Sequence, residues 1–216
     1  DEKAIKLSKH IETMKAHMIA NDLATAKGVY QFFKARSEGN DVVILDAETE
    51  QEIQRFQFPR QDGGNELCLT DYMKPNQVEP ICFFVVTSGQ KASQYCNQLK
   101  EEGKYGDSAV ASAIALECAE GCAEYIHQQI RTVWGIPDKP GITTAELYKL
   151  HYTGLRVSFG YPACPRLEDQ AKLWEILDPE THIGVTLSEE YMMWPEGSVS
   201  AMVFYHPQAR YFRINE

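Results

Sequence analysis

The chain has 216 residues, of which 44% are hydrophobic and 24% are charged, so we expect one folded domain over residues 1–216 with a sizeable core. Thirty-one acidic residues against 21 lysines and arginines give a formal net charge of −10, and no basic stripe interrupts them, which argues against nucleic acid as a partner. No stretch approaches the ~18 apolar residues of a membrane span, and no signal-peptide pattern opens the chain. We therefore expect a soluble, cytoplasmic protein with no membrane partner.

The first part of the chain predicts one helix followed by short strands. An amphipathic pattern covers about residues 4–24, and it begins without a methionine or a cap, so we expect the chain to be a fragment of a longer polypeptide. Strands are expected at about 29–35, 41–46 and 52–58, and a turn at 62–65. The apolar run 81–87 lacks alternation, which indicates a central strand covered on both faces.

Helices dominate the middle of the chain. One is expected near residues 90–102, and the longest begins at Asp107 or Ser108 as cap and ends at Gly135. Helical spacing assigns its core-facing side to Val110, Ile114, Cys118, Cys122, Tyr125, Gln129 and Val133. A second row of mostly small residues consists of Ala109, Ala113, Leu116, Glu120, Ala123 and His127.

The sequence allows two interpretations of Glu120. If the second row is covered, its carboxylate lies on a partly enclosed face and needs a partner, for which a ligand ammonium or sulfonium cation is one candidate. The alternative is a solvated acidic stripe formed with Glu117 and Glu124.

After this helix the sequence predicts a short helix capped by Thr143 or Thr144. A further helix is expected near 167–177 and a strand around 183–187. Two more strands, near 198–205 and 210–214, are expected to form a hairpin that brings His206 and Tyr211 to one end. Strands first, helices between and a hairpin last predict an α+β fold with a mostly antiparallel, twisted sheet and flanking helices. The absence of a Gly-rich turn between a strand and a helix argues against a Rossmann-type methyltransferase.

Neither the cysteines nor the histidines form a pattern typical of catalysis. The six cysteines include no C-x-x-C pair, and Cys118 and Cys122 lie one helical turn apart, so we expect buried thiols and no metal site. The histidines have no evident Ser or Cys partner, and we expect no nucleophile–base pair.

The segment from Arg156 to Pro165 is the most informative part of the chain. Its two prolines stiffen the backbone and lack N–H groups, while Gly160 permits a positive φ or a close approach. Backbone carbonyls can accept from a ligand amine, and Arg156 offers a planar fork for a carboxylate. This combination fits an amino-acid-like ligand; the alternative is a proline-rich connection with Arg156 in a surface ion pair.

The same segment is followed by further motifs in a fixed order. They are Leu173–Leu177, Met193–Pro195, Ser198–Ser200 and His206–Phe212, with Ala119–His127 upstream and, more loosely, Cys68–Tyr72 and Val85–Gly89. In this order the sequence resembles the C-terminal activation domain of cobalamin-dependent methionine synthase, the module that binds S-adenosylmethionine. The resemblance runs from about Val29 to Phe212, and the N-terminal ~28 residues match weakly.

This resemblance implies a single C-shaped domain with S-adenosylmethionine in a shallow groove across the sheet edge. It implies that Arg156 pairs with the methionine carboxylate and that Gly160, Tyr161 and Ala163 line the site. It further implies that Tyr211 and Phe212 complete the site and that Glu120 lies near the positive end of the ligand. Tyr161 would also face the corrin of cobalamin when the cobalamin-binding module docks.

The resemblance also implies a role in the whole enzyme. S-adenosylmethionine would remethylate cob(I)alamin held by the cobalamin-binding module, while a flavodoxin or similar reductase supplies the electron. The isolated domain would not be active alone.

Three departures from the family pattern keep other functions open. Leu150 stands where some members have an acidic residue, Arg166 and Leu167 replace an acidic residue and a histidine, and an upstream segment with a ligand-contacting aspartate has no match. One alternative is a docking module for a corrinoid protein that does not bind S-adenosylmethionine. Another is a degenerate structural domain, against which the intact Arg156, Gly160, Tyr161 and Tyr211 argue.

Overall fold

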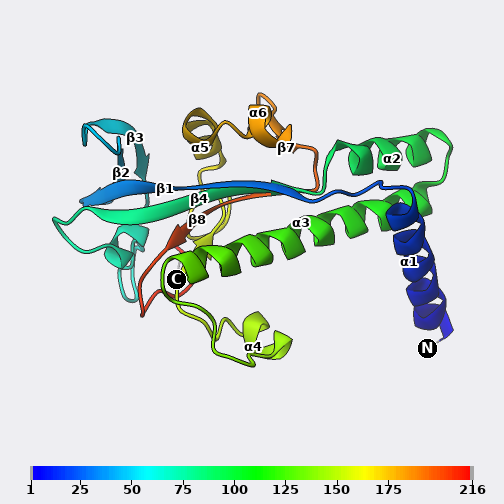
Figure 1. Cartoon of the computed structure of the whole chain (residues 1–216), viewed down its shortest axis with the longest axis horizontal. Helices are drawn as coiled ribbons and strands as arrows, with labels where there is room; N and C mark the ends of the chain where they lie inside the picture. Colours follow the sequence, from blue (N-terminus) through cyan, green and yellow to red (C-terminus); the bar gives the residue numbers. More distant parts are fainter. Residues whose placement is uncertain (1, 215–216) are drawn as a thin grey trace. The chain divides into compact units, whose positions relative to one another are not determined.

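A computed structural model describes residues 2–214 of the chain (Figure 1). Its elements in chain order are α1 (Glu2–Ala20), β1 (Lys27–Glu38), β2 (Asp41–Leu45), β3 (Glu52–Gln57), β4 (Glu79–Thr87), α2 (Gln90–Glu101), α3 (Tyr105–Val133), α4 (Thr144–Tyr148), β5 (Leu155–Val157), α5 (Gln170–Leu177), α6 (Pro179–Ile183), β6 (Thr186–Leu187), β7 (Met193–Trp194) and β8 (Ser198–Phe204). Short 3₁₀ turns precede β4 and α5.

A six-stranded sheet in the order β3-β2-β1-β4-β8-β5 is the centre of the fold. β1 pairs with β2, β2 with β3, and β5 with β8, each antiparallel. The predicted α+β class with a mostly antiparallel sheet and flanking helices is therefore confirmed. None of the helices among residues 2–214 is long and apolar enough to cross a membrane.

The described residues form two compact units. The first contains residues 2–29, 85–124 and 179–199, and the second contains residues 30–84, 125–178 and 200–214. The boundaries between the two units fall within four elements, which are β1, β4, α3 and β8. The assignment of residues 1–216 to one domain stays a prediction.

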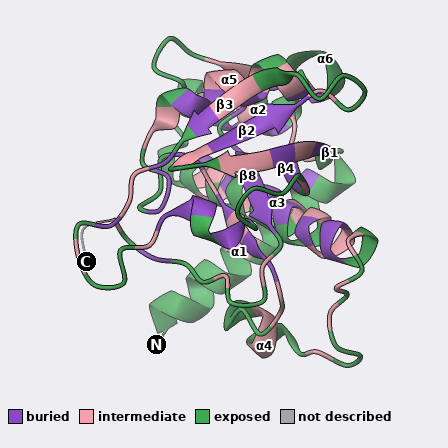
Figure 2. Cartoon of the chain, turned by 90° about the vertical axis from the view of Figure 1, so that its left-hand side faces the viewer, coloured by how far each residue is buried: buried purple, intermediate pink, exposed green. Residues whose placement is uncertain are grey.

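β4 confirms the expectation of a central strand. Every residue from Ile81 to Thr87 is buried, because the strand lies between β1 and β8 and has both faces covered. In the second unit Phe83 stacks on Phe56, with 5.2 Å between the ring centroids, and meets Phe33 edge-on at 5.8 Å. Figure 2 shows the buried residues as purple stretches along the strands, with β2 almost wholly purple.

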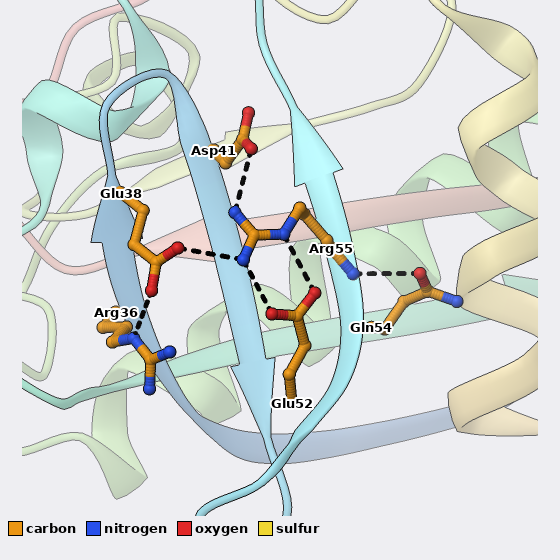
Figure 3. Close-up of polar contacts among 6 residues, drawn as sticks. All are labelled: Arg36, Glu38, Asp41, Glu52, Gln54 and Arg55. Atoms are coloured by element: carbon orange, nitrogen blue, oxygen red, sulfur yellow. Dashed lines mark hydrogen bonds and ion pairs between the residues drawn. The ribbon is translucent and has the colours of Figure 1, made fainter.

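A charged cluster in the second unit crosses β1 and β2 to the edge strand β3 (Figure 3). The Arg55 guanidinium donates to Glu38 at 2.9 Å, Asp41 at 3.0 Å and Glu52 at 2.6 Å, so one side chain links three strands. Hydrogen bonds from Arg36 and then Arg55 lower the pKa of Glu38. Because these groups are partly exposed, we expect the cluster to protect the sheet edge more than to stabilise the fold.

In the first unit, helices α1 and α2 and the start of α3 share one core. It consists of Met14, Met18, Ala92, Cys96, Leu99, Ala111 and Ala115. The Ser108 hydroxyl donates to the Cys96 carbonyl at 2.8 Å and ties α3 to α2. Ser108 is therefore inside the helix, and the prediction that it or Asp107 caps α3 is wrong: the helix begins at Tyr105.

The predicted core face of α3 is also wrong. The buried residues recur every four positions as Ala111, Ala115, Ala119, Ala123 and His127, followed by Ile130 and Arg131. Among the residues predicted to face the core, Tyr125 is 60% exposed and Val133 is 66% exposed. The others on that predicted side are half-buried. Alanine lets neighbouring backbone approach closely, so a row of small residues marks the packed face better than a row of larger ones.

The end of the chain contains two further corrections. The predicted strand around 183–187 is shorter than expected, because Ile183 is the last residue of α6 and the strand covers Thr186–Leu187. Residues 210–214 form no strand, so the predicted hairpin is absent from the described part of the chain. Side chains hold this segment instead: the Tyr72 hydroxyl donates to the Arg210 carbonyl at 2.7 Å, and the Gln61 amide donates to the Arg213 carbonyl at 2.6 Å.

The predicted cap of α4 is confirmed, and the predicted burial of the cysteines is confirmed in part. Thr143 caps α4 in a capping box with Glu146, whose carboxylate accepts from the Thr143 N–H at 2.8 Å. Four of the six cysteines are buried as predicted, and Cys118 and Cys122 are half-buried. Burial raises the pKa of the Cys164 thiol to about 12, so this thiol remains protonated near neutral pH.

Candidate functional site

Arg156 lies in the middle of β5, where the local pattern directs it away from the core. Leu155 and Val157 are buried, while Arg156 between them is half-buried. Pairing of β5 with β8 places Arg156 opposite Val203. The strand therefore presents the guanidinium on the face opposite its two apolar neighbours.

A tight turn follows β5 and contains the next predicted site residues. The Gly160 N–H donates to the Cys164 carbonyl, and the Cys164 N–H donates to the Tyr161 carbonyl, both at 2.8 Å. Gly160 has a φ of +82°, and a Cβ added there would lie 3.1 Å from Leu167 Cδ1. This turn requires glycine at 160 and leaves the Tyr161 ring 57% exposed at its tip.

Tyr211 joins this turn from the C-terminal segment. Burial raises the pKa of its phenol, and a hydrogen bond with the Ala163 backbone acts in the opposite direction. Tyr161 and Cys164 also lie close enough to influence this pKa. The structure thus brings Tyr161, Ala163 and Tyr211 together, although about fifty residues separate them in the chain.

Phe212 points elsewhere. Its ring is buried and meets the Tyr72 ring edge-on, with 6.3 Å between centroids. The side chain of Phe212 therefore belongs to the core under the C-terminal segment.

Glu120 differs from the other predicted site residues. It is exposed on α3, so the expectation of a partly enclosed face is wrong. Glu120 also belongs to the first unit, whereas Arg156, Gly160, Tyr161, Ala163, Tyr211 and Phe212 belong to the second.

Sequence reasoning missed a buried polar cluster next to β5. It consists of His127 and Arg131 on α3, Asp138 after the helix, and Tyr152 before the strand. The His127 ring meets the Tyr152 ring edge-on at 5.2 Å, and neither imidazole nitrogen has a hydrogen-bond partner among residues 2–214. The one signal in the sequence is the spacing of four between His127 and Arg131, which places both on one helix face.

His127 should make the protein sensitive to acid. Burial and, secondarily, the charges of Arg131 and Arg156 lower its pKa from 6.5 to about 2. Because the unfolded state takes up the proton first, stability is complete above pH 6.5 and falls as the pH drops below that value. Between about pH 7.5 and pH 5 the loss due to this one group is about 2 kcal/mol.

Chemical denaturation at both pH values tests this prediction. In a His127→Leu variant we expect the fall in unfolding free energy between the two pH values to be about 2 kcal/mol smaller than in the unmodified chain. His182→Gln is the matched control, since His182 is exposed. An equal pH dependence in all three proteins would show that His127 is not held neutral by burial.

Within residues 2–214 no group of three or more His, Cys, Asp or Glu side chains is arranged to hold a metal ion. The site residues are instead one arginine, aromatic rings and backbone groups of a stiff turn. Such a set can bind an anionic and partly apolar organic ligand.

Comparison with known proteins gives consistent matches along the chain. A family model described as "Vitamin B12 dependent methionine synthase, activation domain" matches residues 1–216. The chain is 38% identical over 207 residues to methionine synthase of Mycobacterium tuberculosis (strain ATCC 25618 / H37Rv), with 89% of this chain and 17% of that protein covered. It is also 38% identical over 208 residues to methionine synthase of Mycobacterium leprae (strain TN), with the same coverage.

A solved structure is similar as well. The crystal structure of the MetH reactivation domain bound to AdoHcy matches with a TM-score of 0.89 and 30% sequence identity, and covers 98% of this chain and 68% of that chain. The present chain spans about one sixth of the length of the curated relatives it matches.

Proposed function

Since the chain belongs to the family of vitamin B12-dependent methionine synthase activation domains, we propose that it binds S-adenosylmethionine and supports reactivation of that enzyme. The observation that carries this proposal is the similarity to a reactivation domain bound to AdoHcy. AdoHcy is S-adenosylmethionine without the transferred methyl group, so a site for one fits most of the other. The turn that joins Tyr161, Ala163 and Tyr211 supports the same assignment.

Arg156 is proposed to bind the carboxylate of the ligand. A guanidinium matches a carboxylate with two parallel hydrogen bonds, and these bonds are stronger where solvent is partly excluded. The half-buried position of Arg156 on β5 fits this role.

The turn after β5 is proposed to hold the rest of the ligand. Gly160 permits the positive φ of the turn, and Ala163 is fully buried beneath it, so both shape the backbone of the site. The exposed ring of Tyr161 provides a flat apolar surface. Tyr211 fixes the turn through its hydrogen bond with the Ala163 backbone. We propose that Phe212 contributes through its backbone, because its ring is buried. Glu120, which is exposed and belongs to the first unit, stays a prediction from the sequence.

The proposed reaction is remethylation of cob(I)alamin, with S-adenosylmethionine as the methyl donor. The residues of this chain fit a positioning role, because methyl transfer from a sulfonium needs no general base. Arg156 and the turn would fix the donor, and the exposed Tyr161 ring would face the corrin. We propose that the cobalamin is held by another module of the same enzyme, that a flavodoxin or similar reductase supplies the electron, and that the enzyme works in the cytoplasm.

Substitution of Arg156 tests the proposed site. Arg156→Ala should weaken binding of S-adenosylmethionine by about 1.5–3 kcal/mol, or roughly 10- to 150-fold in Kd, the range for a hydrogen bond to a charged group. Calorimetric titration measures the effect. Arg36→Ala is the control, because Arg36 lies on β1 in an ion pair with Glu38. Equal affinity of the Arg156→Ala variant and the unmodified chain would remove Arg156 from the site.

The second candidate function is a docking module that binds a corrinoid protein without S-adenosylmethionine. The exposed apolar side chains around α4 favour it, since Tyr148 is 83% and Leu150 53% exposed. Binding of a cobalamin-loaded module in the absence of S-adenosylmethionine, with no calorimetric signal for the small ligand, would support this function over the first.

A further inference from the structure

Arg131 and Asp138 form a buried ion pair that the proposed site does not include. The Arg131 Nε donates to Asp138 Oδ1 at 3.0 Å, and Nη2 donates to both carboxylate oxygens at 2.8 Å. The two side chains are 1% and 6% exposed. Gln128 donates a further hydrogen bond to Asp138 at 3.1 Å. A charge pair this buried holds its geometry closely, because either charge alone would be costly.

Arg131 also lies against the segment that precedes β5, at Tyr152 and Gly154. Its guanidinium carbon lies 4.0 Å from the centroid of the Tyr152 ring, which is a cation–π contact. Its Cδ lies 3.8 Å from the position where a Cβ on Gly154 would be. Gly154 has a φ of +102°, and the same Cβ would lie 3.5 Å from the Phe204 carbonyl oxygen of β8. Gly154 therefore lies close to both Arg131 and β8.

We propose that Arg131, anchored by Asp138, is a positioning residue that directs Arg156 toward the carboxylate of the ligand. Arg131 contacts the Tyr152 ring and lies close to Gly154, and β5 begins at the next residue. In this proposal these contacts set where β5 starts, and so they keep Arg156 opposite Val203. This inference rests on the proposed function, since it assumes that Arg156 receives the carboxylate.

The charges around Arg156 agree with this role. Arg131 and Arg156 both depress the pKa of His127, so both guanidinium groups lie near its ring. Asp138 neutralises Arg131, and His127 stays uncharged. The pair and the neutral ring thus place no additional net charge beside Arg156, so they do not oppose its attraction for a carboxylate.

The test compares two ligands on two variants of Tyr152. S-adenosylhomocysteine carries the carboxylate, whereas 5′-methylthioadenosine has the same adenosine and sulfur but lacks it. Tyr152→Leu removes the ring on which Arg131 rests, and Tyr152→Phe retains that ring. We expect Tyr152→Leu to weaken S-adenosylhomocysteine binding by about 10-fold and methylthioadenosine binding by less than about 2-fold, with Tyr152→Phe close to the unmodified chain. Arg156→Ala should show the same selectivity.

Other outcomes are equally informative. Equal weakening of both ligands by Tyr152→Leu would mean that the ring only supports the fold, and it would overturn the positioning role. If Tyr152→Leu does not fold, Arg131→Lys replaces it, because lysine keeps the charge and loses the planar contact with both Tyr152 and Asp138; a variant of either kind that retains full S-adenosylhomocysteine affinity contradicts the inference. Absence of S-adenosylhomocysteine binding by the unmodified chain would overturn the proposed function itself.

Discussion

Asp138→Ala is expected to lower the free energy of unfolding by about 3–5 kcal/mol, because it leaves the Arg131 guanidinium buried without its counter-charge. Asp138 accepts three hydrogen bonds from Arg131, and the Arg131 side chain is 1% exposed, so solvent cannot replace the carboxylate without local opening. Arg131 Nη1 already has no hydrogen-bond partner among residues 2–214, which raises the cost of losing the others.

Urea denaturation at neutral pH measures this loss. The control is Glu12→Ala, which removes an exposed ion pair with Lys15 on α1 and should change the unfolding free energy by less than about 1 kcal/mol. If both variants lost the same small amount, the Arg131–Asp138 pair would be solvated, and the positioning role inferred for Arg131 would lose its basis.

Phe83→Ala should also lower the free energy of unfolding by about 3–5 kcal/mol, the usual cost of truncating a fully buried aromatic side chain. Phe83 lies on the central strand β4 and contacts Phe33 and Phe56, and Phe56 in turn packs on Phe159 with 5.9 Å between centroids. Since Phe159 directly precedes Gly160, the cavity should also loosen the turn that holds the proposed ligand.

Thermal and urea denaturation test the stability of this variant, with Tyr148→Ala as the control. Tyr148 is an aromatic residue at 83% exposure, and its truncation should cost less than about 0.5 kcal/mol. A loss below about 1.5 kcal/mol for Phe83→Ala would contradict the placement of β4 at the centre of a tightly packed sheet.

Features with a strong local cause were predictable from the sequence. The unbroken apolar run from Ile81 to Thr87 indicated a strand covered on both faces, and β4 lies between β1 and β8 as expected. Thr143 and Glu146 form a capping box that depends on residues three apart, so no knowledge of the tertiary structure was needed.

Features decided by distant contacts were not predictable in the same way. The buried face of α3 follows its alanines, because their burial depends on how closely other elements approach and not on their own hydrophobicity. The segment after β8 is held by side chains of Tyr72 and Gln61, which lie 138 and 152 residues before their partners, and so the expected hairpin does not form.

The candidate site shows the same division. The stiff turn at Gly160 could be anticipated from its glycine and prolines, whereas the hydrogen bond of Tyr211 with the Ala163 backbone links distant parts of the chain. The Arg131–Asp138 pair connects the end of α3 to the segment that follows it, and Arg131 also contacts the Tyr152 ring and lies close to Gly154. Charge spacing alone does not distinguish such a pair from a surface ion pair.

Calorimetric titration of the purified chain with S-adenosylmethionine, with S-adenosylhomocysteine as the second ligand, tests the central claim most directly. We expect saturable binding of both ligands to a single site that the Arg156→Ala variant loses in large part. No heat with either ligand at concentrations up to about millimolar, where even binding of roughly −4 kcal/mol would be detected, would contradict the proposed function.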